Sequence, residues 1–351
     1  GKAMSKQKWY EAPLIAAEAV YWKTPSEIWF WASILSFAAS LAVGIFVPSE
    51  PNALYLRNVS ELSRAESFIR RNLYHIVLIV FIAVFIFLYF FYKDKPRKRK
   101  KLYHKAQFIF AAGIILAVWD LLTAKSRILP IPYCPGFSEI VTVMFDDRIL
   151  LLVSMAYSFR LFAAGLILGT TLGIVTGACI GWSKQWDYWL SPVIRVSGII
   201  PAVAWLPIAL MVFPNSFTTG LFLIFISSWF PVSSMAASGI LATPVSYFEA
   251  AKTLGADNKF LLFKVAIPNA MPSMFTGIMT ATAFSFTTLI VSEMVGAKAG
   301  LGFYINWAKG WGNYSKVYAA IIIIALEFSI IIAIINAIRS NTLRWQRGIV
   351  R

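Results

Sequence analysis

This chain has few charged residues. Of its 351 residues, 14% are charged and 59% are hydrophobic, and the mean hydropathy is +0.69. A soluble domain typically carries about 25% charged residues. This composition excludes a soluble globular protein and predicts an integral membrane protein whose solvent is lipid.

Cysteine and histidine are scarce as well, with two of each. Cys134 and Cys179 lie far apart, and His75 and His104 lie at a span start and in a basic loop, so neither a disulfide framework nor a metal site is indicated. The sequence also has no glycine-rich phosphate loop ending in Lys-Ser or Lys-Thr and no His-Glu-x-x-His pattern. We therefore expect no catalytic residue, no metal, no cofactor and no ATP hydrolysis by this chain itself.

Acidic residues are outnumbered by basic ones, 16 to 32. The positive charge flanks apolar runs instead of forming a separate basic surface. This arrangement is typical of cytoplasmic loops that meet anionic lipid headgroups. It favours membrane lipid over nucleic acid as the partner of the basic residues.

Long apolar runs dominate the rest of the chain, and a helix needs about 20 such residues to cross a bilayer. The sequence predicts an all-α protein with about eight transmembrane helices. They lie near 28–47, 74–92, 107–124, 156–182, 198–213, 219–241, 274–296 and 317–338. The fifth is short and contains Pro201 and Pro207, so we expect it to be broken or kinked.

Loop charge predicts the orientation of these spans. The densest basic run, 93–101, should be cytoplasmic. Counting spans from there places both termini inside, together with 183–197, 242–273 and 339–351. The segments 48–73, 125–155, 214–218 and 297–316 fall outside. The first apolar run begins near Ile28 after a polar stretch and continues as a full span, so no cleavable signal is expected.

One cytoplasmic segment has a specific pattern. Glu249-Ala250-Ala251 is followed after three residues by Gly255 and, after nine more, by the stretch that ends at Pro268. Small alanines allow a partner to approach closely, glycine suits a left-handed turn, and proline ends or restarts a helix. The pattern predicts a short helix, a tight turn and a second short helix between two spans, which together form a docking element.

This segment resembles the EAA loop of binding-protein-dependent ABC-transporter permeases. The resemblance covers about 108–347 and is closest to the nitrate, sulfonate and taurine branch. It rests on the following further stretches: Trp119-Asp120-Leu121-Leu122, Ser158-Phe159-Arg160, Pro201 to Pro207, Ser292 to Gly296, Gly300-Leu301-Gly302 and Leu343-Arg344-Trp345. The chain departs from the family at Phe213-Pro214-Asn215 and in its first hundred residues.

The resemblance implies two parts. Residues 1–105 form an N-terminal extension with two extra spans and a basic cytoplasmic loop. Residues 106–351 form the ABC permease domain, with the EAA coupling loop at 242–273. The role of the extension is left open.

The resemblance also implies a function. The chain would be the permease subunit of an importer in a bacterial inner membrane and would form the solute pathway. Two ATP-binding subunits would bind ATP and dock on Glu249, Ala250, Ala251, Gly255 and Pro268. A second permease copy and an extracytoplasmic solute-binding protein would complete the complex. The branch implies a small anion such as nitrate, a sulfonate or taurine, although similar permeases carry vitamin-like solutes.

Five residues are candidates for the pathway: Arg160, Trp205, Glu293, Asn306 and Glu327. Each has a structural alternative. Arg160 can reach the membrane interface, Trp205 and Asn306 can belong to an interfacial belt, and the two acids can be structural carboxyl groups.

The glycines that recur every four residues from Gly165 to Gly181 are another feature with two interpretations. They form either a sliding or dimer-lining face or a surface for close packing within the chain.

A second class of function is a self-sufficient secondary transporter or channel. Glu327 and the broken fifth span would then serve ion coupling. This hypothesis leaves the cytoplasmic docking element unexplained.

Overall fold

The computed structural model describes residues 27–47, 64–126, 128–129 and 132–345, and every regular element in these ranges is a helix. The chain divides into two compact units, residues 1–146 and 147–351, which are described separately. The predicted boundary at 105/106 follows the family resemblance and stays a prediction, whereas the division by contacts falls after Asp146.

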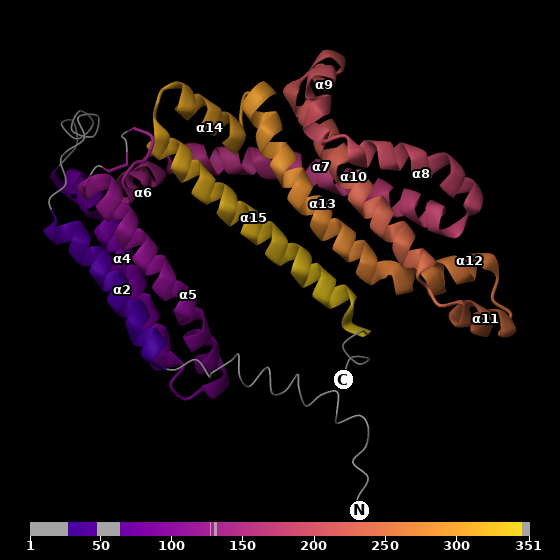
Figure 1. Ribbon diagram of the computed structural model, residues 1–351, viewed down its shortest axis with the longest axis horizontal. Coiled ribbons are helices and arrows are strands. Elements are labelled where there is room, and N and C mark those ends of the chain that lie inside the picture. Colours follow the sequence, from indigo (N-terminus) through magenta and orange to yellow (C-terminus); the bar gives the residue numbers. More distant parts are fainter. Residues whose placement is uncertain (1–26, 48–63, 127, 130–131, 346–351) are drawn as a thin grey trace, which may run out of the picture. The chain divides into compact units, whose positions relative to one another are not determined.

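The N-terminal unit is built from three long helices, α2 (Glu27–Phe46), α4 (Arg64–Phe91) and α5 (Pro96–Asp120), followed by the π-helical turn η1 (Leu121–Lys125) and by α6 (Phe137–Asp146). The helices α2, α4 and α5 lie side by side (Figure 1). Phe30 stacks on Phe85 with ring centroids 4.9 Å apart, and the ammonium of Lys125 donates to the carbonyls of Gly44 and Val47 at the end of α2. The first predicted core span therefore packs with the two extra spans.

The C-terminal unit holds the remaining elements. They are α7 (Arg148–Trp182), α8 (Lys184–Ile199), η2 (Ala202–Trp205), α9 (Leu206–Val212), α10 (Ser216–Leu241), α11 (Val245–Thr253), α12 (Asn258–Phe260), the π-helical turn η3 (Leu261–Ala266), α13 (Ile267–Gly296), α14 (Leu301–Gly310) and α15 (Tyr314–Thr342).

The glycine stripe of α7 packs against α10. Gly165 faces Ile224, Gly173 faces Val232 and Gly181 faces Ile240, with a constant offset of 59 residues. A constant offset means that the two helices run parallel. A missing Cβ at every fourth position lets their backbones approach closely. The stripe therefore serves packing within the chain, which was one of its two interpretations.

Parallel packing requires the chain between α7 and α10 to return across the unit. The return is made by α8 and by the η2–α9 segment, which are bent by 92° at the break between them. Ile200 is extended (φ −83°, ψ 118°) because the residue before a proline avoids the helical region. Pro207 lies in the first turn of α9, where its missing N–H costs nothing.

The described residues contain seven helices long and apolar enough to span a membrane, or eight if the bent pair is one span. The prediction of about eight spans with a broken fifth is thus confirmed. Several of its boundaries were wrong. The predicted loop 183–197 is the helix α8, in which charges such as Lys184, Asp187 and Arg195 obscure the apolar period. The third, fourth and seventh spans were predicted to start near 107, 156 and 274, whereas their helices start at Lys98, Arg148 and Asn258. The predictions for residues before 27 and after 345 lie outside the described residues.

The glycine stripe gives a stability prediction. A Cβ on Gly177 would lie 2.4 Å from the backbone oxygen of Ser233, an atom that cannot move without shifting α10. We expect Gly177→Ala to destabilise the chain by about 1–3 kcal/mol through overpacking. The matched control is Gly310→Ala, because nothing lies within 4 Å of a Cβ there. Equal thermal unfolding midpoints in detergent for the two variants would contradict the prediction.

Candidate functional site

The predicted docking element has the expected local structure. Helix α11 is followed by a turn at Leu254–Asp257 and by α12 and η3, a segment that we call the coupling element (Val245–Ala266). Gly255 has φ +84°, the left-handed conformation that the sequence predicted. Pro268 lies in the first turn of α13, but α12, η3 and α13 form one continuous helix over Asn258–Gly296, so the predicted second short helix is the beginning of a span.

The coupling element follows the end of α10, beyond the long helices (Figure 1), and it exposes apolar side chains. Leu254 is 89% exposed, and further exposed apolar residues are Val245, Tyr247, Phe260 and Phe263. Glu249 and Ala250 are exposed and Ala251 is half-buried. Large contiguous exposed apolar surface usually marks a site of protein or membrane contact.

A groove of about 380 Å³ opens on the same element. Its walls come from α11, η3, the start of α13 and the end of the described chain, and the lining residues are Tyr247, Ala250, Lys264, Val265, Pro268, Asn269 and Trp345. The groove places Ala250 and Pro268, two members of the predicted docking set, on one surface.

At the other end of α13 lies a polar junction, formed by Glu293, Ser158 and the first turn of α14. Glu293 is 1% exposed. Its carboxylate accepts the Ser158 hydroxyl at 2.8 Å and the backbone N–H of Gly302 at 2.9 Å. The Ser158 oxygen in turn accepts the N–H of Leu301 at 2.9 Å. Glu293 therefore satisfies donors at the start of a helix, where an anion is favoured.

The loop before α14 depends on glycine at this junction. Gly300 has φ +111°, and a Cβ there would lie 2.3 Å from a carboxylate oxygen of Glu293. The Gly-Leu-Gly stretch noted in the sequence thus makes room for the Glu293 side chain.

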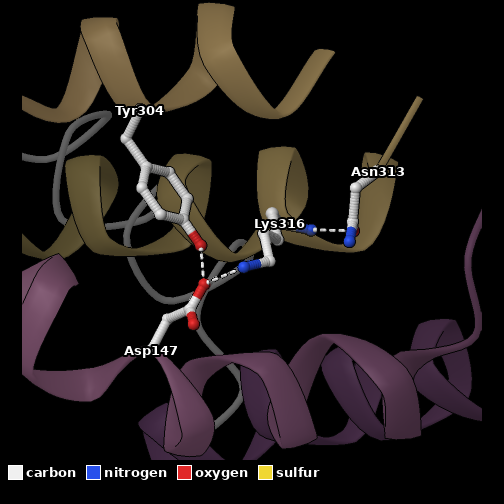
Figure 2. A network of polar contacts seen from close by, with 4 residues as sticks. All are labelled: Asp147, Tyr304, Asn313 and Lys316. Carbon is white, nitrogen blue, oxygen red and sulfur yellow. Dashed lines mark hydrogen bonds and ion pairs between the residues drawn. The ribbon is translucent and has the colours of Figure 1, made fainter. Parts of the chain in front are cut away.

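A second polar network holds the starts of α7 and α15 together with α14. Figure 2 shows Asp147 accepting the phenol of Tyr304 at 2.6 Å and pairing with the ammonium of Lys316, also at 2.6 Å. Asn313 accepts the backbone N–H of Lys316 at 3.2 Å and thereby caps α15. The Lys316 ammonium also lies 5.3 Å from the ring centroid of Trp307. We call these contacts the Asp147 latch.

Burial, followed by the hydrogen bond to Asp147, raises the pKa of Tyr304 above the ordinary tyrosine value. The phenol therefore keeps its proton at neutral pH and remains the donor in this contact.

The structure brings only some of the pathway candidates together. Asn306 donates to the carbonyl of Met294 at 2.9 Å and so joins the Glu293 junction. Glu327 is 3% exposed in the middle of α15, and neither of its carboxyl oxygens has a hydrogen-bond partner among the described residues. The pathway roles of all five candidates stay predictions.

The other two candidates contact α10. The guanidinium of exposed Arg160 lies 4.8 Å from the ring centroid of Phe217, at the start of α10. Trp205 packs against the cluster of Leu206, Ala209 and Leu223.

Sequence reasoning missed the latch. Asp147 lies in the run Asp146-Asp147-Arg148, which reads as ordinary loop charge, and Lys316 lies just before an apolar span. Ser158 was noticed only as part of a family stretch. Nothing in the sequence pattern indicates that these residues meet, because their contacts join positions more than 130 residues apart.

Together, the spans describe a multi-pass membrane protein with an exposed apolar element at one end and a buried polar junction at the other. Residues 169–345 match the family described as binding-protein-dependent transport system inner membrane component, and the chain belongs to this family. It is therefore a permease subunit of an ABC-type transporter and not a catalytic subunit. Members of the family generally work with an ATP-binding and a solute-binding partner.

Several curated relatives are similar over most of their length. The nitrate import permease protein NrtB of Synechococcus elongatus is 31% identical over 65% of this chain and 86% of its own. The putative aliphatic sulfonates transport permease protein SsuC of Bacillus subtilis is 25% identical over 73% and 92%. The bicarbonate transport system permease protein CmpB of Synechococcus elongatus is 31% identical over 54% and 66%.

Among solved structures, the MetNI methionine ABC transporter in an inward-facing form is 18% identical, with a TM-score of 0.47 over 56% of this chain and 98% of that one.

The polar junction yields a matched pair of variants. Gly300→Ala should destabilise the chain through both a left-handed φ and a collision with Glu293, whereas Gly312→Ala (φ +68°, open space) bears only the φ strain of about 1–2 kcal/mol. We expect the Gly300 variant to unfold at a lower temperature than the Gly312 variant. If both midpoints fell equally, the close fit around Glu293 would be wrong.

The latch can be tested by a double-mutant cycle with Asp147→Asn and Lys316→Gln. Each side chain is about one-fifth exposed (20% and 21%), so we expect a coupling free energy of roughly 0.5–1 kcal/mol that shrinks in high salt. Lys309→Gln on the exposed face of α14 is the control and should leave stability unchanged. Strict additivity of the two variants would show that the ion pair contributes nothing.

Proposed function

We propose that this permease imports a small oxyanion and is driven by two separate ATP-binding subunits that dock on its coupling element. The observation that supports this proposal most strongly is the exposed apolar surface of the coupling element, with Leu254 at its tip. Such a surface lies beyond the spans and needs a protein partner to cover it.

In this proposal Glu249, Ala250, Ala251, Gly255 and Pro268 form the contact through which ATP binding moves the spans. Closure of the ATPase dimer pulls on α11 and η3, and the spans rock between inward-open and outward-open states. A second copy of this chain supplies the other wall of the pathway. The coupling needs two global states that differ in affinity for ATP.

The packing supports one sidedness for the unit. Because α7 and α10 run parallel and α15 begins beside the start of α7, the coupling element lies at one face and the latch at the other. The basic run 93–101 and the need for ATP favour a coupling element in the cytoplasm, with both termini on the same side. The latch and α14 then face the solute-binding protein.

The substrate class follows from the relatives. Their names refer to nitrate, aliphatic sulfonates and bicarbonate, all small oxyanions. The exposed guanidinium of Arg160 near the outer ends of the spans can attract an anion. A vitamin-like solute is the alternative within the same transporter class.

Docking is tested with the tagged full chain purified in mild detergent from its native membrane. Leu254→Asp places a charge at the tip of the apolar surface and should reduce recovery of the ATP-binding subunit at least about tenfold, as loss of an interface hot spot does. Gly255→Pro, which cannot keep the positive φ, should uncouple ATP hydrolysis from uptake. Lys309→Ala, at the opposite end of the unit, is the control.

The same complexes in liposomes test the substrate. We expect ATP-dependent uptake of nitrate, bicarbonate or an aliphatic sulfonate, delivered by the co-purified binding protein. Normal uptake by both coupling-element variants would overturn the docking proposal. Uptake without ATP by the chain alone would identify a secondary transporter instead.

A further inference from the structure

The basic stretch at the junction of α4 and α5 has no part in the proposed transport function. We call residues 93–105 the basic end of the N-terminal unit. This stretch contains six lysines and two arginines but a single acidic residue, Asp94. All six lysines are exposed: Lys93, Lys95, Lys98, Lys100, Lys101 and Lys105. Like charges at such short spacing repel one another, so an anionic partner stabilises the arrangement.

The protein itself neutralises little of this charge. Among the described residues, the acidic groups at this end of the unit are Asp94, in the turn, and Glu27, at the start of α2. Glu27 already accepts the hydroxyl of Tyr89. None of the six lysines has an ion-pair partner within the described ranges. The described part of the chain therefore leaves most of the positive charge for a partner.

Three of the cations lie over aromatic rings at the helix ends. The charged groups and the ring centroids are 5.0 Å apart for Lys95 and Phe91, 5.5 Å for Lys98 and Tyr92, and 5.9 Å for Arg99 and Tyr103. Such a contact holds a charged group in place through the face of the ring. Ammonium and guanidinium groups carry several N–H donors each, so donors remain for the oxygen atoms of an anion.

The start of α5 is fixed to the core of the N-terminal unit. Leu102, Tyr103 and Ala106 are buried and pack in one cluster with Phe30 of α2 and Phe85 of α4. The lysines on the exposed side of the same turns therefore cannot move away from the helix ends without breaking this packing.

The same helix ends expose apolar side chains next to the cations. Phe87, Phe90 and Phe91 of α4 are 64%, 62% and 57% exposed, and Phe108 of α5 is 80% exposed. Both helices contain stretches long and apolar enough to cross a membrane, so these side chains contact lipid tails. Cations that follow directly on such a surface lie at the depth of the lipid headgroups, where lysine stems cover apolar surface and the ammonium groups reach phosphates. This position favours lipid over an acidic protein, because the connection is only the short turn Tyr92–Lys95.

We propose that the basic end binds the phosphodiester headgroups of anionic phospholipids, which makes the N-terminal unit a lipid-binding module of this permease. The ligand is the phosphate group of a bilayer lipid, whose negative charge and oxygen atoms match ammonium and guanidinium donors. The proposal stands on the N-terminal unit alone. It depends neither on the solute nor on the docking of ATP-binding subunits.

The test uses the tagged full chain in a neutral detergent. Native mass spectrometry measures the binding of phosphatidylglycerol and of phosphatidylcholine, which differ in headgroup charge, at equal acyl-chain length. We expect phosphatidylglycerol to bind at least about tenfold more tightly at low salt, with a preference that shrinks as salt rises. The combined variant Lys98→Gln, Lys101→Gln and Lys105→Gln removes three exposed charges from one face of α5 and should lose most of this preference.

Two matched variants separate charge from fold. Arginine at the same three positions keeps the charge and should keep the preference. The combined variant Lys184→Gln, Lys298→Gln and Lys309→Gln removes three exposed charges from the C-terminal unit and should keep it as well.

Equal binding of the two lipids by the unaltered chain, or an unchanged preference in the α5 glutamine variant, would overturn the proposal. Binding of poly-glutamate without any preference for phosphatidylglycerol would also overturn it and would identify a surface for an acidic protein. Because these measurements use the permease alone, they can fail while the transport proposal stands, and the reverse also holds.

Discussion

The close contact between α7 and α10 is the constraint on which the C-terminal unit depends. A glycine at every fourth position of α7 removes the side chains that would hold the helices apart, and the constant register against α10 fixes them as parallel. Two consecutive long helices can be parallel only if the chain between them returns. The bent α8–α9 segment, with its break at Ile200 and Pro201, follows from that requirement.

The same constraint separates the two candidate sites. Since α10 runs parallel to α7, the coupling element that follows its last turn lies at one end of the unit. Helix α13 then returns antiparallel, with Gly277 close to Met235 and Gly239 close to Ala270. It arrives at the opposite end as the helix that carries Glu293. The docking surface and the polar junction are thus the two ends of one helix pair.

Much of this could be predicted from the sequence, because the physics involved is local. The length of the apolar runs predicted the spans, Gly255 predicted the left-handed turn, and Pro268 predicted a change in the helix where α13 begins. The extent of α8 could not be predicted, since charges along an interrupted helix look like those of a loop.

The polar junction could not be predicted either. Ser158 and Glu293 are 135 positions apart, and no sequence pattern indicates that they are in contact. For the same reason Glu293 looked like a pathway residue, although its two donors also account for its burial as a structural anchor of α14.

Helix α13 connects these parts mechanically. Its first turn, at Pro268 and Asn269, lines the groove of the coupling element, and its last turn carries Glu293. Its 30 residues span about 45 Å at the rise of an α-helix, enough to cross the membrane. A π-helical turn directly before it, Leu261–Ala266, gives the helix a point at which it can shift relative to α11. A displacement imposed on the groove would therefore act, along one helix, on the contact between Glu293 and Ser158 of α7.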